Sequence, residues 1–149
     1  MQSYRIRSYT ESDRPSVLKL LALNTPNRFS PKEKEDFEHY LNKEIEQFFV
    51  VEIGDEIIGC GGINFSNDPT TGKISWDIIN PDFQGQGIGK ACLDYRIDIL
   101  KKYPRLDRII VRTSQHAFQF YEKNGFELLE IHNDYWAKGF DMYLMKFVG

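Results

Sequence analysis

The chain has 149 residues, of which 41% are hydrophobic and 28% are charged, and its formal net charge is −3. This length favours a single domain, residues 1–149, with one packed core, and the negative charge argues against a nucleic-acid partner. No apolar run approaches the ~20 residues of a membrane helix. Residues 1–5 lack the pattern of a signal peptide, and two cysteines are too few for a disulfide framework. We therefore expect a cytoplasmic protein without a membrane partner.

The first third of the chain predicts one strand and two helices. Residues 4–7 alternate as a short strand does. Thr10 is a suitable N-cap for a helix that ends near residue 23, before the breaker sequence of residues 24–27. Ser30 and Glu33 form a capping-box pattern, which predicts that a second helix begins there.

Strands dominate the middle of the chain. Residues 48–53 and 56–63 read as two strands joined by the tight turn Gly54-Asp55, so a hairpin is predicted. Three glycines in the second strand indicate a bulge or a close neighbour. A further strand, 73–79, ends at Asn80-Pro81.

The last part alternates helices and strands. An apolar stripe predicts a helix over residues 87–103, followed by a buried strand at 108–112. A helix at 116–123 and strands at 127–131 and 141–147 complete the chain. The predicted order is β-α-α-β-β-β-α-β-α-β-β, a mixed α/β sheet whose first half is largely antiparallel.

Alternating glycines, Gly85, Gly87 and Gly89, separate the strand at 73–79 from the helix that follows. A loop without Cβ atoms lets backbone N–H groups converge. The helix N-terminus adds partial positive charge, so the place favours a phosphate or pyrophosphate. Two familiar nucleotide motifs do not fit. The dinucleotide pattern would need glycine at Lys90, and the ATPase phosphate loop would need glycine at Gln84.

The run does fit the pattern Gln/Arg-x-x-Gly-x-Gly/Ala, with Gln84, Gly87 and Gly89 in the named places. A second segment, 114–126, resembles Asn-x-x-Ala-x-x-Phe/Leu-Tyr-x-Lys-x-Gly-Phe. Its matching residues are Ala117, Phe120, Tyr121, Lys123, Gly125 and Phe126. The two motifs, in this order, resemble those of the GNAT superfamily of N-acetyltransferases, and the predicted strand order agrees with that fold over nearly the whole chain.

The resemblance implies acetyl-CoA as co-substrate. No metal is expected, because the three histidines His39, His116 and His132 are scattered and lack metal-ligand spacing. It implies that Ile79 contacts the pantetheine arm, along a strand that splays from its neighbour. The residues implied around the pyrophosphate are Gln84, Gly85, Gln86, Gly87, Ile88, Gly89 and Lys90. Ser114 replaces the usual asparagine, and its hydroxyl can still bond the cofactor, with less reach and one fewer donor.

Tyr121 is the predicted general acid, as its family counterpart is. Acetyl transfer from a thioester expels a thiolate, and a phenol with an ordinary pKa near ~10 is protonated at neutral pH and can donate to that sulfur. Without the motif, the helix alone favours a core aromatic at Tyr121. Asp77 shares a strand face with Ile79 and is the candidate base or amine anchor. A solvated strand aspartate is the alternative interpretation.

The acceptor is predicted to lie against the last hairpin. Asp134 and Asp141 can attract a cationic amine, and Tyr135 and Trp136 can form aromatic walls. The alternatives are an ordinary hairpin or a dimer contact, so both monomer and homodimer are left open. The predicted reaction is acetylation of a primary amine on a small molecule or a peptide or protein N-terminus. Transfer of another acyl group and a non-catalytic CoA-binding module are the alternatives.

Overall fold

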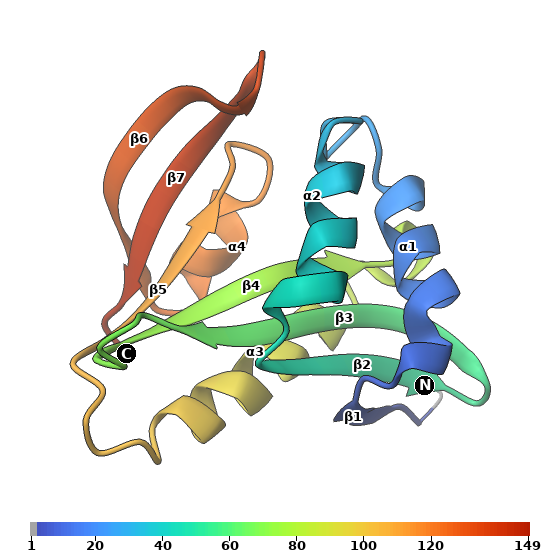
Figure 1. The fold of residues 1–149 in the computed structure, drawn as a ribbon, viewed down its shortest axis with the longest axis horizontal. Coiled ribbons are helices and arrows are strands. Elements are labelled where there is room, and N and C mark those ends of the chain that lie inside the picture. The colour runs from blue at the N-terminus through green and yellow to red at the C-terminus, as the bar shows by residue number, and fades with distance from the viewer. Residues whose placement is uncertain (1–2) are drawn as a thin grey trace.

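Residues 3–149, which the computed structural model describes, form one seven-stranded sheet in the order β1-β2-β3-β4-β5-β7-β6 (Figure 1). Met1 and Gln2, which begin both the predicted domain and the N-terminal segment, lie outside the described residues. The strands are β1 (Arg5–Ser8), β2 (Gln47–Ile53), β3 (Glu56–Phe65), β4 (Thr71–Ile79), β5 (Arg108–Thr113), β6 (Phe126–Ala137) and β7 (Phe140–Phe147); the α-helices are α1 (Arg14–Leu23), α2 (Glu33–His39), α3 (Ile88–Leu100) and α4 (Phe118–Lys123). The predicted mixed α/β class and element order are confirmed.

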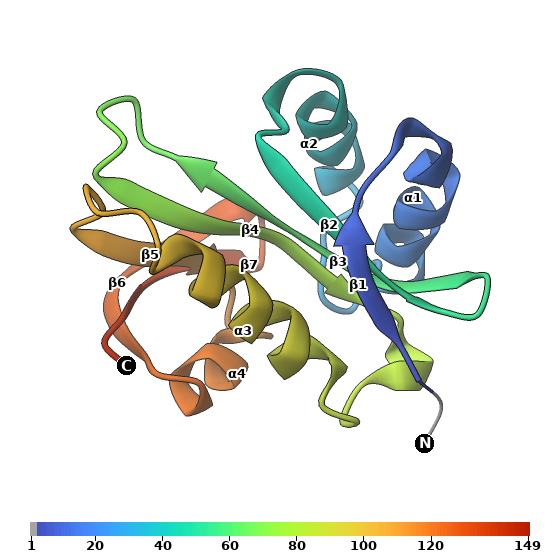
Figure 2. The ribbon, with the colours of Figure 1, turned by 90° about the horizontal axis from the view of Figure 1, so that it is seen from below.

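Helices cover both faces of the sheet. On one face, α1 and α2 pack through Leu20 and Phe37 against Phe48 and Cys60. On the other face, α3 and α4 lie together, as Figure 2 shows, and bury Leu93 and Tyr121 against Phe49 and Val111. Strand β2 is therefore buried on both sides, which explains its unbroken apolar sequence.

The helix starts follow the predicted capping residues with small shifts. Thr10 precedes a short 3-10 turn, where the Asp13 carboxylate accepts the Thr10 N–H at 2.8 Å, and α1 begins at Arg14. The Glu33 carboxylate accepts the Ser30 N–H at 2.8 Å, as the capping box predicts. After His39 the chain continues as a π-helical turn, Tyr40–Glu44.

A bulge between β3 and β4 confirms the reading of the three glycines. The register shifts between Cys60 and Gly62, so Gly61 faces both Trp76 and Asp77. Trp76 has φ 51°, in the left-handed region. A Cβ on Gly61 would lie 2.6 Å from Asp77 Oδ1, so this close approach requires glycine.

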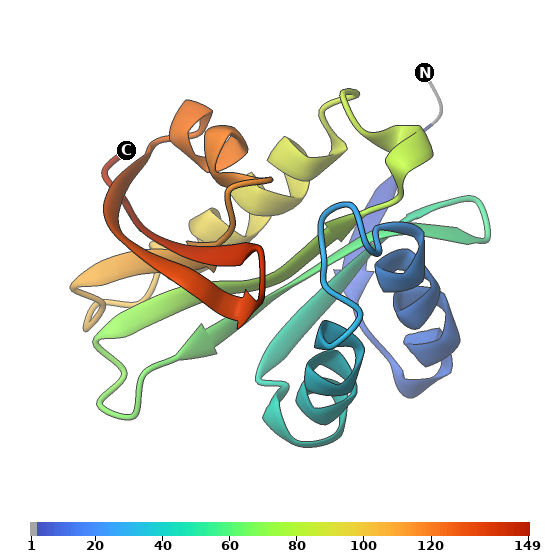
Figure 3. The ribbon, with the colours of Figure 1, turned by 90° about the horizontal axis from the view of Figure 1, so that it is seen from above.

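The last hairpin is longer than predicted. Strand β6 continues to Ala137 and β7 begins at Phe140, so the expected loop at 133–141 is largely strand. The prediction was wrong because β6 is an edge strand that is exposed over most of its length and lacks an apolar alternation there. Figure 3 shows this hairpin on one side of the sheet's midline and α1 and α2 on the other.

Strands β4 and β5 are the one parallel pair of the described sheet, and they pair only over Thr71–Ile74 and Arg108–Val111. Strand β4 runs on to Ile79 without β5 beside it. This divergence, which the family resemblance implied, opens the sheet at its centre. Within residues 3–149, the structure contains no helix of sufficient length and hydrophobicity to cross a membrane.

Candidate active site

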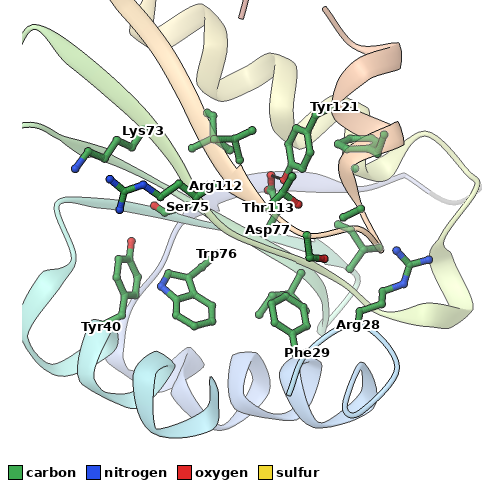
Figure 4. A pocket seen from close by; sticks show the side chains of 18 of the residues that line it. Arg28, Phe29, Tyr40, Lys73, Ser75, Trp76, Asp77, Arg112, Thr113 and Tyr121 are labelled. Atoms are coloured by element: carbon green, nitrogen blue, oxygen red, sulfur yellow. Dashed lines mark hydrogen bonds between the residues drawn. The ribbon is translucent and has the colours of Figure 1, made fainter. Parts of the chain in front are cut away.

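A cavity of about 1010 Å³ lies where β4 and β5 diverge. Its walls come from β4 and β5, the glycine loop, α4, the segment between α1 and α2, and the hairpin residue Trp136. Figure 4 shows Tyr121 and Asp77 near the middle of this cavity, with Lys73, Arg112 and Tyr40 toward one side and Arg28 and Phe29 toward the other. The sequence motifs and the divergent strands therefore meet in one space.

The glycine loop opens directly onto the cavity. Gly87 is the N-cap of α3 with φ 82°, and Gly85 has φ 78°, so both occupy conformations that favour glycine. Neither position has a protein atom within 4 Å of where a Cβ would be. The first amides of the 13-residue helix α3 point outward without helical acceptors, so the loop provides donors and space for an anion.

Not every predicted cofactor residue lines the cavity. Those that do are Ile79, Gln84, Gly85, Gly87, Gly89, Lys90 and Ser114. Ile88 is buried in the core beneath the loop, and Gln86 is exposed outside the cavity lining. The Lys90 ammonium lies 2.6 Å from Asp94, and the Ser114 hydroxyl accepts the His116 N–H at 3.2 Å.

Gln84 and Asn24 fix the end of β4. The carbonyl oxygen of Ile79 accepts hydrogen bonds from Asn24 Nδ2 at 3.0 Å and from Gln84 Nε2 at 3.2 Å. Asn24, which is buried, also donates to the Leu20 carbonyl at 2.8 Å and so joins this strand end to α1. The sequence motif placed Gln84 beside the cofactor, and the structure adds that its side chain holds the loop against β4.

Tyr121 and Asp77 meet in the cavity. The Tyr121 hydroxyl donates to Asp77 Oδ2 at 2.5 Å. Asp77 Oδ1 forms an ion pair with Arg96, which is fully buried on α3 and also donates to the carbonyl oxygens of Gly62 and Cys92. Both candidate catalytic residues therefore belong to one buried hydrogen-bonded cluster.

Sequence reasoning did not find Arg96. It lies within the apolar stripe of α3, three residues after Leu93 and four after Cys92, so helical spacing alone puts it on the buried face. A buried arginine requires an acidic partner, and this is the signal that could have indicated the pair with Asp77.

The cluster has clear protonation states. Burial raises the pKa of Tyr121 well above its usual value, and the Asp77 carboxylate raises it further. Burial opposes the charge of Arg96, but the Asp77 carboxylate outweighs this effect and its pKa remains above the ordinary range. The phenol is therefore protonated and the guanidinium charged at neutral pH.

The predicted substrate residues separate into two groups. Trp136 lines the cavity, and its indole N–H donates to the Thr113 carbonyl at 3.1 Å. Asp134, Tyr135 and Asp141 lie outside the cavity lining. The two carboxylates accept backbone N–H groups within the hairpin, Asp141 from residue 134 at 2.9 Å and Asp134 from Gly139 at 2.7 Å.

The segment between α1 and α2 forms the opposite wall. Phe29 lines the cavity and stacks on Trp76, with ring centroids 6.3 Å apart. Glu33, recognised in the sequence only as a capping residue, also lines the cavity. It is buried, and burial raises its pKa to about 7.

Comparison with known proteins gives the family. The family model described as the Acetyltransferase (GNAT) family matches residues 14–126. This chain belongs to the GNAT acetyltransferase family. The resemblance stated from the two motifs is thereby confirmed, and the chain is placed among the acetyl-CoA-dependent N-acetyltransferases.

Two GNAT relatives are similar over most of the chain. An N-alpha-acetyltransferase of Sulfurisphaera tokodaii is 27% identical over 97% of this chain and 92% of its own length. An uncharacterized N-acetyltransferase of Methanocaldococcus jannaschii is 26% identical over 88% of this chain. The match spans 64% of the length of the latter protein.

Solved structures agree in fold. The ribosomal-protein-S18-alanine N-acetyltransferase of Escherichia coli superposes with a TM-score of 0.78 and 19% identity, covering 97% of this chain and 93% of that one. An N-acetylglutamate synthase of Neisseria gonorrhoeae, solved with coenzyme A and N-acetyl-glutamate, gives 0.73 and 16% identity, covering all of this chain and 36% of that one. At these identities the likeness shows the fold alone.

Proposed function

We propose that this protein transfers an acetyl group from acetyl-CoA to a primary amine of a small molecule or a peptide or protein N-terminus. The observation that carries the proposal is the shared cavity, because a glycine loop suited to an anion and the Tyr121 hydroxyl both line it. A pyrophosphate on the loop and a thioester beside Tyr121 would be the two ends of one extended cofactor.

The cofactor would enter along the open edge of β4. The loop Gln84, Gly85, Gly87, Gly89 and Lys90 would surround the pyrophosphate, with Gln86 and Ile88 contributing backbone only. The pantetheine arm would follow β4 from Ile79 toward Asp77, where β5 no longer pairs with it. Ser114, at the start of the α4 segment, would hydrogen-bond the arm from the opposite side.

The reaction would be direct attack. The amine nitrogen forms a bond to the thioester carbonyl carbon, the carbon–sulfur bond breaks, and the sulfur leaves as a thiolate. Tyr121 would give its hydroxyl proton to that sulfur. The resulting phenolate would lie beside Asp77, and the buried charge of Arg96 would offset the repulsion between the two anions. The nitrogen releases one proton as it becomes an amide, and the phenolate would take up that proton, which restores the Tyr121 hydroxyl.

Asp77 would act mainly through Tyr121. Both of its oxygens already have partners, Arg96 and Tyr121, which favours positioning of the acid over the role of a free base. Trp136 would form one wall for the acceptor. Asp134, Tyr135 and Asp141 would act at the outer rim, where a long or peptide substrate passes the hairpin.

Two measurements on the intact chain test this function. Calorimetry should show binding of acetyl-CoA, and a screen of primary amines should then show release of CoA with formation of an amide. Undetectable binding at millimolar acetyl-CoA would refute the proposal. Binding without turnover of any amine would favour the alternative of a non-catalytic CoA-binding module, and faster turnover with succinyl-CoA would favour another acyl group.

A further inference from the structure

The acceptor end of the cavity carries two cationic side chains that have no counter-ion. Lys73 on β4 and Arg112 on β5 both line the cavity, and neither takes part in an ion pair within residues 3–149. Their neighbours Ile74 and Val111 pack into the core beneath α3. Because side chains alternate along a strand, Lys73 and Arg112 share the opposite face, and Figure 4 shows them side by side.

A buried hydroxyl faces the same region. Tyr40 is only 3% exposed and lines the cavity from the turn after α2. Its hydroxyl lies close to Ser75, yet it has no well-formed hydrogen bond within the described part of the chain. The Ser75 hydroxyl itself donates to Asn64 Oδ1 at 2.7 Å. A buried donor without an acceptor is costly, and a ligand acceptor would satisfy it.

Acidic groups also line this end, and their positions leave the two cations available. Glu46 uses Oε1 to accept from Asn64 and from the Phe65 N–H. Glu44 follows Lys43 on the same turn, and both line the cavity. Asp77 is paired with Arg96, so none of these carboxylates contacts Lys73 or Arg112.

We propose that Lys73, Arg112 and the Tyr40 hydroxyl form a carboxylate subsite, so that the acceptor is a primary amine that also bears a carboxylate. This rests on the proposed acetyltransferase function and names the class of its substrate. The amine would lie near Tyr121 and Asp77 and the carboxylate beside Ser75. Ser75 and Asp77 lie on either side of Trp76, whose left-handed backbone interrupts the regular spacing of the strand. An acidic amino acid, free or at the start of a peptide, is an acceptor that carries both an amine and a carboxylate, and the acceptor series below varies the distance between them.

The test compares matched acceptors with saturating acetyl-CoA. Glutamate is compared with glutamine, and a peptide beginning Ala-Glu with one beginning Ala-Gln. Glycine, β-alanine and 4-aminobutyrate vary the distance between amine and carboxylate. In the favoured pair, the kcat/KM of the acid should be about tenfold or more above the kcat/KM of the amide. A difference of this size corresponds to one charge-assisted contact. The pair that shows the preference distinguishes a free amino acid from a peptide.

Substitutions in the subsite test whether its side chains cause the preference for the acid over the amide. Lys73→Met, Arg112→Gln and Tyr40→Phe should each raise KM for the acid about tenfold, leave kcat within about twofold and leave the amide unaffected. Arg105→Gln, an exposed residue outside the cavity lining, is the matched control. Tyr40→Phe removes only a hydroxyl, so a structural role alone would not discriminate between acid and amide.

The outcomes separate the two proposals. Equal turnover of acids and amides, or a preference that survives all three substitutions, would overturn the carboxylate subsite and leave the acetyltransferase function standing. Binding of acetyl-CoA without turnover of any acceptor would overturn the function. Titration of glutamate into the CoA-loaded protein then decides the subsite alone: binding that Arg112→Gln weakens supports it, and no binding at millimolar glutamate refutes it.

Discussion

The hydroxyl of Tyr121 on α4 donates a 2.5 Å hydrogen bond to Asp77 of β4, at the place where β4 and β5 diverge. The bulge at Gly61 turns Asp77 toward α3, where Arg96 neutralises it without contact with solvent. The Asp77 carboxylate therefore holds the proton donor Tyr121, and Arg96 balances the charge of that carboxylate from the side of α3. This arrangement fixes the direction of the hydroxyl and keeps it protonated.

Tyr121→Phe removes the proposed acid and keeps the ring that packs against Phe126. We expect cofactor affinity within about twofold of the wild type and turnover slower by ~10²-fold or more, because general acid catalysis contributes this much. Calorimetry and single-turnover CoA release measure the two quantities. Phe118→Leu, on the same helix and outside the cavity lining, serves as a packing control. Unchanged turnover in the phenylalanine variant would mean that Tyr121 is only a core aromatic.

Asp77→Asn leaves the buried guanidinium of Arg96 without a counter-ion. Breaking a buried pair in this way costs about 3–5 kcal/mol of unfolding free energy, which urea denaturation measures. The double variant with Arg96→Met should recover most of the loss, because no charge then remains buried. Asp94→Asn is the control, since its pair with Lys90 is exposed and worth about 0.3–0.5 kcal/mol. An Asp77→Asn protein as stable as the wild type would contradict the ion pair.

The parts of the site that lie within one local pattern could be predicted from the sequence. The glycine loop and the Tyr121 segment each occupy a short run whose spacing carries the information. The Asp77–Arg96 pair joins β4 to α3 and depends on the left-handed backbone at Trp76, which no residue pattern indicated. Lys73 and Arg112 come together only through the parallel register of β4 and β5.

The hairpin of β6 and β7 also has features that could not be predicted from the sequence. Its aromatic and acidic residues predict a substrate wall, and the structure adds that one oxygen each of Asp134 and Asp141 accepts a backbone N–H of the hairpin itself. Edge strand β6 has little burial to impose an apolar pattern, so its length could not be predicted from periodicity. The contacts of these carboxylates within the hairpin could not be predicted from composition.

Gly87→Ala tests the loop. The left-handed φ of 82° costs a residue with a Cβ about 1–2 kcal/mol, and the new methyl group would project into the space proposed for the pyrophosphate. We expect the Kd for acetyl-CoA to rise about tenfold or more. Gly54→Ala, in the hairpin of β2 and β3 with φ 56°, should lose comparable stability with no change in Kd. Equal affinities in both variants would refute the loop assignment.

Glu33 should make stability depend on pH. Its pKa is raised from 4.5 to about 7 because it is buried, so between these two values the folded chain retains a proton that the unfolded chain has released. The contribution of Glu33 to the free energy of unfolding is therefore greatest below pH 4.5 and falls as the pH rises toward 7. One such proton gives a slope of at most about 1.4 kcal/mol per pH unit.

Glu33→Gln removes this slope and retains an oxygen that can accept the Ser30 N–H. Urea denaturation at pH 5, 6, 7 and 8 should show that the unfolding free energy of the glutamine variant rises relative to that of the wild type up to pH 7. Above pH 7 the difference between the two proteins should stay constant. Glu35→Gln, exposed on the same helix, controls for the loss of one negative charge. Parallel curves for Glu33→Gln and wild type across the whole range would show that Glu33 ionises normally and that the cavity wall beside it is open to water.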